Sequence, residues 1–299
     1  MTTVGWLTIP TGPGIATLAA LRRGHVPWSF GGAPDVGAIG PIGRATVRTG
    51  AGTVSLIAIV VPLSPEAIRE DLRRTRAWVE RAAAAALEAG ADTLALPETL
   101  SAPAVISRLM DRATPTTTGA ATRAWSLWRQ TRVHFRAHGG DIGVLGSADA
   151  AIDAAVGLLV SEGLHVRVEA RSPLAERRIR ALGATPARAD EIQATCRIVL
   201  TGRGARLPQG TIGVGPAGVV LPSPLRAGPA SMLGWWRDLG GRTRVPAALA
   251  EGIALAATGS AAVGDSPNPD AVRRVSGWME HLGMSPELPP ISRRAPESR

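Results

Sequence analysis

The chain has 299 residues, of which 45% are hydrophobic and 19% are charged, so it can bury a sizeable core and form two domains. It contains no Lys and no Tyr, and each of its 33 basic residues is therefore Arg. Without Lys the chain cannot form a Schiff base, anchor pyridoxal phosphate or build a phosphate loop of the Gly-x-x-x-x-Gly-Lys type. The proton relay of short-chain dehydrogenases, which needs Tyr and Lys, is excluded for the same reason.

The formal charge of +9 raises the question of a nucleic-acid partner. The Arg residues are spread along the chain and stacking aromatics are scarce, so we interpret the charge as a solvated surface and expect no nucleic acid. A single Cys196 excludes an intramolecular disulfide and fits a reducing cytoplasm. The mainly apolar stretch from Val54 to Leu63 is about half of a membrane-spanning helix, and we expect no signal peptide at the start of the chain. We therefore expect a cytoplasmic protein with no membrane span.

Strand and helix patterns alternate in the first half of the chain. The predicted strands cover residues 4–9, 45–48, 54–61 and 93–96, with a hairpin-like turn between the second and the third. The predicted helices cover residues 14–23, 64–89, 102–112 and 119–137, and residues 24–43 are rich in Gly and Pro and predict a loop. Ser64 is the expected N-cap of the second helix, with Pro65 at its first position. Glu98 falls in a loop at the carboxyl end of a strand, where α/β folds bind their ligands.

The second half predicts a doubly wound unit. Strands at 142–145, 165–169 and 197–201 alternate with helices at 148–161 and 173–182. Residues 213–221 suggest short strands, and residues 244–257 and 269–282 suggest helices. The expected fold is α/β, with a Rossmann-like parallel sheet and an N-terminal α/β substrate-type domain. We expect this N-terminal domain at 1–138, the Rossmann-like domain at 139–245, helices that pack back on the cleft at 246–289 and a frayed tail at 290–299.

The turn after the first strand of that unit decides whether a dinucleotide is expected. A Gly-x-x-Gly-x-x-Gly pattern would begin at Gly146, but Asp149 and Ile152 stand at its second and third glycine positions. We expect Asp149 to cap the helix and to occupy the site that a phosphate would use.

The candidate cofactor-binding residues follow from this turn and from the end of the next strand. They are Gly146, Ser147, Glu169, which could take a ribose diol, and Arg171, which could take a 2′-phosphate. Either no cofactor or weakly bound NAD(P)H is expected.

Segments along nearly the whole chain resemble the long-chain fatty acyl-acyl-carrier-protein reductases, which form aldehydes. The resemblance rests on these segments: Gly5-Trp6-Leu7-Thr8, Leu72 to Leu96, Thr117-Thr118-Gly119, Val144 to Gly146 and Ala247 to Leu282. It implies a reductase in which a Cys takes the acyl group from a carrier thioester and a nicotinamide hydride releases the aldehyde.

The chain departs from that family where the chemistry lies. The nucleophile of that family lies in a motif similar to Ala-Cys-Phe-Ala-Glu-Ala, which corresponds to residues 247–252 of this chain. Ala248 therefore stands at the nucleophile position, and its methyl group cannot attack a thioester. Cys196 precedes an apolar run and is interpreted as a buried core residue rather than a replacement.

Several candidate site residues remain. Thr117, Thr118, Gly119 and Ala248 are the candidate substrate-binding residues, by the resemblance. Glu251 lies one helical turn after Ala248 and is the first candidate catalytic acid or base, with Glu98 the second. The alternative for Glu251 is a structural carboxylate that pairs with Arg242 or Arg244, and the alternative for Glu98 is a solvated loop residue.

No metal site is expected. Among the His residues only His134 and His138 have ligand-like spacing, and two nitrogens alone make a poor site.

Three functions of different class remain open. The first is a repurposed protein that binds an acyl or polyketide-like apolar molecule without redox chemistry, as a cyclase, lyase or isomerase or as a binding protein. The second is an NAD(P)H-dependent reductase of an aldehyde, ketone or thioester without a covalent intermediate. The third is a non-catalytic partner of a reductase or of an acyl carrier protein.

Overall fold

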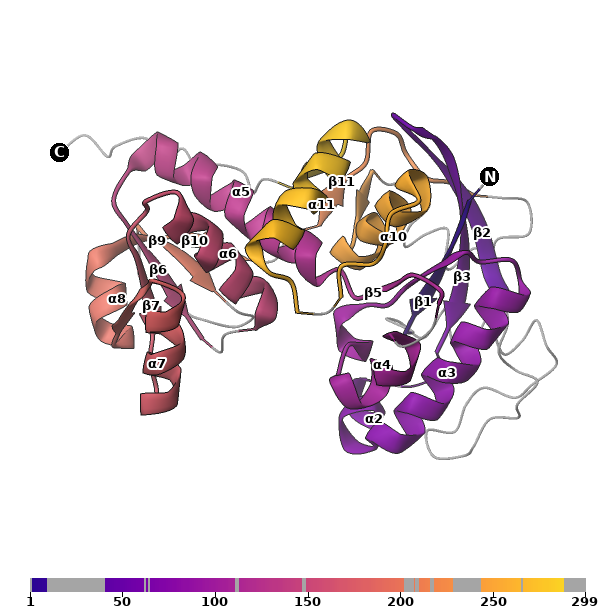
Figure 1. Cartoon of the computed structure of the whole chain (residues 1–299), viewed down its shortest axis with the longest axis horizontal. Coiled ribbons are helices and arrows are strands. Elements are labelled where there is room, and N and C mark those ends of the chain that lie inside the picture. The colour runs from indigo at the N-terminus through magenta and orange to yellow at the C-terminus, as the bar shows by residue number, and fades with distance from the viewer. Residues whose placement is uncertain are drawn as a thin grey trace.

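The computed structural model describes residues 2–9, 41–61, 63, 65–110, 113–146, 149–201, 207, 210–215, 218–227, 243–264 and 266–287. Two α/β units lie side by side, and the long helix α5 (Ala120–His138) runs from one to the other (Figure 1). Helices α10 (Ala247–Thr258) and α11 (Pro269–His281) lie between them. The predicted helix at 14–23 and loop at 24–43 fall largely outside the described residues.

The first unit is built on a six-stranded sheet in the order β12-β2-β3-β1-β4-β5. Its strands are β1 (Thr3–Thr8), β2 (Pro41–Thr49), β3 (Gly52–Val60), β4 (Thr93–Ala95), β5 (Thr116–Thr117) and β12 (Arg226–Ala227). Strands β3, β1, β4 and β5 are parallel, whereas β2 pairs antiparallel with β3 across the predicted hairpin and β12 pairs antiparallel with β2. The carboxyl ends of the four parallel strands therefore meet at one edge of the sheet.

Alternate residues of the central strands face two separate cores. On β1, Val4 and Trp6 pack on the α10 side, whereas Leu7 packs on the side of α3 (Leu72–Glu88). This follows from the two-residue period of a strand, because each face of the sheet is covered by helix. The core on the α10 side continues through α5 into the second unit, so the two units share one hydrophobic interior.

The second unit is a five-stranded, fully parallel sheet in the order β10-β9-β6-β7-β8. Its strands are β6 (Asp141–Leu145), β7 (Val166–Glu169), β8 (Thr185–Ala187), β9 (Cys196–Thr201) and β10 (Ile212–Val214). The intervening helices are α6 (Ala150–Ser161), α7 (Pro173–Ala181) and α8 (Ala189–Thr195). Chain order reverses between β6 and β9, which is the doubly wound Rossmann arrangement that the sequence predicts.

Two elements of this unit were not predicted. Strand β8 is short and contains Pro186, which argues against a strand in the sequence. It is tolerated because β8 lies at the sheet edge and, among the described strands, pairs only with β7. Helix α8 follows it directly and encloses a small core cluster that includes Ile192 and Cys196.

The prediction of one continuous helix at 64–89 is wrong, because the segment forms two helices. It forms α2 (Pro65–Glu70) and α3, because the side chain of Asp71 accepts a hydrogen bond from the N–H of Arg74 and starts a new helix. Ser64, its expected N-cap, lies outside the described residues. Glu98, expected in a loop, begins the 3₁₀ turn η2 (Glu98–Leu100), and α4 (Pro103–Met110) follows.

The described strands that follow β10 do not pair with the Rossmann-like sheet. Strand β12 joins the first sheet, and β11 (Val219–Val220) pairs with β13 (Arg244–Val245) and β14 (Ser285–Pro286) in a small third sheet. In the described part of the chain, no helix is long and apolar enough to cross a membrane.

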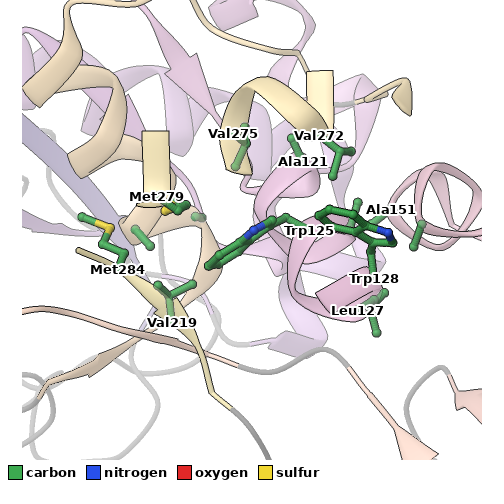
Figure 2. Packing of buried hydrophobic residues seen from close by; sticks show 14 of the residues in the cluster. Ala121, Trp125, Leu127, Trp128, Ala151, Val219, Val272, Val275, Met279 and Met284 are labelled. Atoms are coloured by element: carbon green, nitrogen blue, oxygen red, sulfur yellow. The ribbon is translucent and has the colours of Figure 1, made fainter. Parts of the chain in front are cut away.

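Two tryptophans of α5 fill the interior between the units (Figure 2). Trp125 is fully buried and lies near Val219, Met279 and Met284, and Trp128 points the other way, towards α6. Both tryptophans belong to the hydrophobic core.

Candidate functional site

A buried cluster of polar side chains lies where β5, α5 and α10 meet. The Glu251 carboxylate accepts a hydrogen bond at Oε1 from the hydroxyl of Thr117 (2.5 Å). Its Oε2 accepts two more from Thr122, one from the backbone N–H (2.9 Å) and one from the hydroxyl (2.8 Å). Glu251, Thr117 and Thr122 are each at most 1% exposed.

Glu251 performs the capping of α5 that the N-cap residue itself cannot supply. The N-cap is Gly119, which has no side chain, and Thr122 occupies the third position of the helix, where a capping side chain normally binds the backbone N–H. A carboxylate there also lies favourably in the field of the helix dipole. The cluster therefore fixes α10 to the start of α5.

Glycine is required at position 119 for a second reason. Its φ of +72° is a left-handed conformation, and a Cβ atom there would overlap the backbone N and Cα of Ala248. Ala248 is 4% exposed. The structure thus brings together Gly119, Ala248, Thr117 and Glu251, four of the predicted site residues, and Thr118 is buried beside them.

Burial raises the pKa of Glu251, and the hydrogen bonds from Thr117 and Thr122 act in the opposite direction. The expected pairing with Arg244 is wrong, since Arg244 forms an ion pair with Glu287 (2.8 Å), and Arg242 lies outside the described residues. Both carboxylate oxygens of Glu251 are occupied and the residue is 0% exposed. This geometry supports a structural role in which Glu251 holds α10 against β5 and α5. A catalytic role for Glu251 stays a prediction.

Glu98 lies at the carboxyl edge of the first sheet, just after β4, as predicted. Its Oε2 is 3.3 Å from Nη1 of Arg123, in the first turn of α5. The Glu98 side chain is 41% exposed and that of Arg123 only 12%. Glu98 is therefore exposed to solvent and at the same time ion-paired with Arg123.

Thr122 and Arg123 are site residues that the sequence analysis missed. Their signal was available, because both lie in the first turn of the helix that Thr117-Thr118-Gly119 introduces.

A second group of candidates gathers at the carboxyl edge of the Rossmann-like sheet. The Glu169 carboxylate, at the end of β7, accepts a hydrogen bond from the N–H of Gly146, in the turn after β6 (2.9 Å). The guanidinium of Arg171 donates to the same carboxylate from Nε (2.6 Å) and Nη2 (3.2 Å). These bonds, that from Arg171 above all, lower the pKa of Glu169, which is therefore ionised at neutral pH.

The helix after this turn is capped as the sequence predicts. Asp149 is the N-cap of α6, and its Oδ1 accepts a hydrogen bond from the N–H of Ile152 (2.8 Å). Ser147, another candidate, lies outside the described residues.

The turn partly fits a dinucleotide. Read as Gly-x-Gly-x-x-Gly/Ala, it begins at Gly146, with a φ of +98°, and ends at Ala151, a small residue that is 1% exposed, but Ala148 stands at the middle glycine position. Glu169 stands where an acidic residue binds the adenosine ribose. The Asp149 carboxylate is the feature that opposes a pyrophosphate, because it adds negative charge at the helix N-terminus.

Cys196 and His134 are buried, whereas His138 is partly exposed. Cys196 is 4% exposed, and burial raises the pKa of its thiol. His134 and His138 stack with their ring centroids 6.3 Å apart. Among the described residues, no group of three or more His, Cys, Asp or Glu is placed to hold a metal ion.

No family model and no curated protein matches this sequence. Among solved structures, L-tryptophan dehydrogenase from Nostoc punctiforme is similar at 13% identity, with 94% of this chain and 80% of that chain covered and a TM-score of 0.37. Shikimate 5-dehydrogenase from Thermus thermophilus is similar at 15% identity, covering 94% and 100%, with a TM-score of 0.35. Quinate dehydrogenase from Corynebacterium glutamicum is similar at 15% identity, covering 67% and 70%, with a TM-score of 0.35. The Rossmann-like fold of the second unit is established by its own strand order, independently of these likenesses.

Proposed function

We propose that this chain is an NAD(P)-dependent oxidoreductase that acts directly on a carbonyl or hydroxyl group, without a covalent enzyme intermediate. The observation that carries the proposal is the hydrogen bond between Glu169 and Gly146, which holds an ionised carboxylate at the carboxyl edge of the doubly wound sheet. An acidic side chain at the end of the second strand is the one that binds a ribose diol in such sheets.

The chain's own residues divide the work of binding. Glu169 would accept hydrogen bonds from the adenosine ribose hydroxyls, and the positive φ of Gly146 turns the backbone sharply away from β6. The nicotinamide cofactor supplies the hydride chemistry when it is bound. The protein positions and orients it.

Covalent acyl transfer is not part of the proposal. Position 248 carries a methyl group, and Cys196 lies in the small cluster behind β6 with its pKa raised by burial, which disfavours the nucleophilic thiolate. A reductase of this kind would therefore transfer hydride to its substrate directly. In this respect the chain would be a divergent relative of the acyl-acyl-carrier-protein reductases that it resembles.

Asp149 sets the expected strength of cofactor binding. Two like charges ~5 Å apart at an effective dielectric constant of ~20 repel by about 3 kcal/mol, so a pyrophosphate at α6 would be opposed by the capping carboxylate. We expect dissociation constants for NADH and NADPH on the order of 1 mM.

Isothermal titration of wild type and Asp149→Asn with NADH and NADPH tests the proposal. Asn keeps a capping oxygen for the N–H of Ile152 and removes the charge, so binding should tighten about tenfold or more while stability changes little. Asp149→Ser, which also caps, is the matched second variant. Absence of saturable binding in all three proteins would overturn the proposal.

The Asp149 cap itself favours a second candidate function, a non-redox protein that binds an acyl or polyketide-like apolar molecule. A helix that caps its own N-terminus needs no phosphate. An acyl carrier protein would be the natural donor of such a ligand. Two measurements separate the candidates: the first predicts saturable binding of NADH or NADPH to Asp149→Asn in titration, whereas the second predicts an acyl compound that co-purifies with the chain in native mass spectrometry.

A further inference from the structure

Arg123 has the most buried arginine side chain among the ion pairs of the described residues. Its side chain is 12% exposed, against 40% for Arg129 on the same helix and 73% for Arg171. Within the described part of the chain, Nε and Nη1 of Arg123 are buried and have no hydrogen-bond partner. The contact with Glu98 at 3.3 Å is an ion pair without hydrogen-bond geometry.

This arrangement leaves most of the binding capacity of Arg123 unused. A guanidinium is always charged and carries five N–H donors in a planar fork that matches a carboxylate. Burying such donors without acceptors costs free energy, and unsatisfied polar groups in a folded protein are rare. A group that persists in this state is a candidate for binding a ligand.

The position of Arg123 supports the same conclusion. It lies in the first turn of α5, directly after Thr117 to Gly119, and Glu98 follows the neighbouring strand β4. Both side chains therefore stand at the carboxyl edge of the first sheet, where α/β proteins bind their ligands. Because Glu98 is 41% exposed, a solute can reach the pair from the solvent side.

We propose that Arg123 binds the carboxylate of a small organic acid, which takes the place of the Glu98 carboxylate in the resting protein. The incoming carboxylate accepts paired hydrogen bonds from the guanidinium, which the Glu98 side chain does not. Glu98 is then displaced towards solvent and acts as an internal competitor. One part of this inference rests on the proposed function, namely that the bound acid is the substrate of the oxidoreductase. The substrates would then be hydroxy acids or oxo acids.

Calorimetric titration of the full chain with sodium pyruvate, sodium acetate and sodium phosphate, at a fixed ionic strength of about 0.15 M, tests the site. We expect pyruvate and acetate to bind wild type and Arg123→Met to bind them at least about tenfold more weakly. Glu98→Gln should bind them more tightly, by several fold, because the competing charge is gone. Arg129→Met is the matched control on the same helix and should bind as wild type does.

Each result decides the matter. Equal affinity in wild type and Arg123→Met, unchanged or weakened affinity in Glu98→Gln, or binding of phosphate alone would overturn the inference. The Glu98→Gln variant keeps the test decisive if Arg123→Met does not fold. NADH titration is run separately: cofactor binding without carboxylate binding contradicts this inference alone, and the reverse contradicts the proposed function alone.

Discussion

Glu251 on α10 accepts two hydrogen bonds from Thr122 on α5, and in doing so it caps a helix that is distant in sequence. The local cap residue is Gly119, which supplies no side chain. The start of α5, which also carries Arg123, is thus held in place by α10. A residue that sequence analysis marks as a candidate acid or base therefore has an evident architectural use.

The cap predicts the effect of changing Glu251. Glu251→Ala leaves the N–H and hydroxyl of Thr122 and the hydroxyl of Thr117 without their acceptor. The free energy of unfolding, measured in urea, should therefore fall by about 2–4 kcal/mol. Glu251→Gln keeps one oxygen for Thr122, so its free energy of unfolding should fall by only about 1 kcal/mol.

The pH dependence of that difference has a defined sign. Because burial raises the pKa of folded Glu251 above its unfolded value, its contribution is fully present below that unfolded value of 4.5 and is lost as pH rises through the folded pKa. Wild type should therefore lose stability relative to Glu251→Gln between pH 5 and pH 8. A constant difference over this window would contradict the assignment.

Gly119 should tolerate no side chain. In Gly119→Ala the new Cβ overlaps the backbone of Ala248, so α10 must move and stability should fall by about 3 kcal/mol or more. Gly259→Ala is the matched control at the end of α10, where the backbone is also left-handed (φ +64°, ψ +20°) but nothing lies within 4 Å. It should cost only about 1–2 kcal/mol, which is the cost of the left-handed backbone. Similar losses in the two variants, measured by urea unfolding, would contradict the close-approach argument.

Cys196 should react slowly with iodoacetamide in the native protein. The side chain is 4% exposed, and burial raises the pKa of the thiol, so both access and the reactive thiolate are reduced. Mass spectrometry should find little labelling under native conditions and full labelling in urea. Rapid native labelling with loss of activity would restore a thiolate mechanism.

Sequence patterns predicted the parts of the fold where periodicity is strong. The parallel unit around β6, β7 and β9 follows from apolar runs bounded by Gly and Ser, and the Asp149 cap follows from the turn chemistry of α6. Strand β8 escaped because its Pro is tolerated only at an edge that tertiary structure creates.

The hydrogen-bond partners of the site residues escaped for a different reason. Thr122 and Glu251 are 129 residues apart, and no local pattern indicates which acceptor a threonine hydroxyl meets across the interior. The pairing of Glu98 with Arg123 is likewise a product of neighbouring strands and helices. Chemistry-bearing residues could be identified from sequence, but their roles depended on burial and partner.

Glu169 should govern the choice between the two nicotinamide cofactors. Its ionised carboxylate repels a 2′-phosphate, so Glu169→Ala should shift the ratio of dissociation constants towards NADPH by about tenfold. Arg171→Ala should shift the ratio the other way, since Arg171 is 73% exposed and can meet a phosphate once cofactor binds. Asp149→Asn is the background in which titration measures both ratios. An unchanged ratio in both variants would mean that neither residue touches the adenosine ribose.

His134 should make the protein less stable in mild acid. Its imidazole is 3% exposed and, in the described part of the chain, both ring nitrogens are buried without a hydrogen-bond partner. Burial, followed by the charge of His138, lowers the pKa of folded His134 below 6.5. The unfolded chain then binds a proton that the folded chain resists, so stability is full above about pH 6.5 and falls as pH drops towards the folded pKa.

His134→Phe removes both unpartnered nitrogens, and it should leave stability at pH 7.5 unchanged or raise it by about 1 kcal/mol. It should also flatten the loss between pH 7 and pH 5.5. His281→Gln, at an exposed position, is the control and should keep the wild-type slope. Urea unfolding across that range measures it, and a slope in His134→Phe equal to that of wild type would show that the acid sensitivity arises elsewhere.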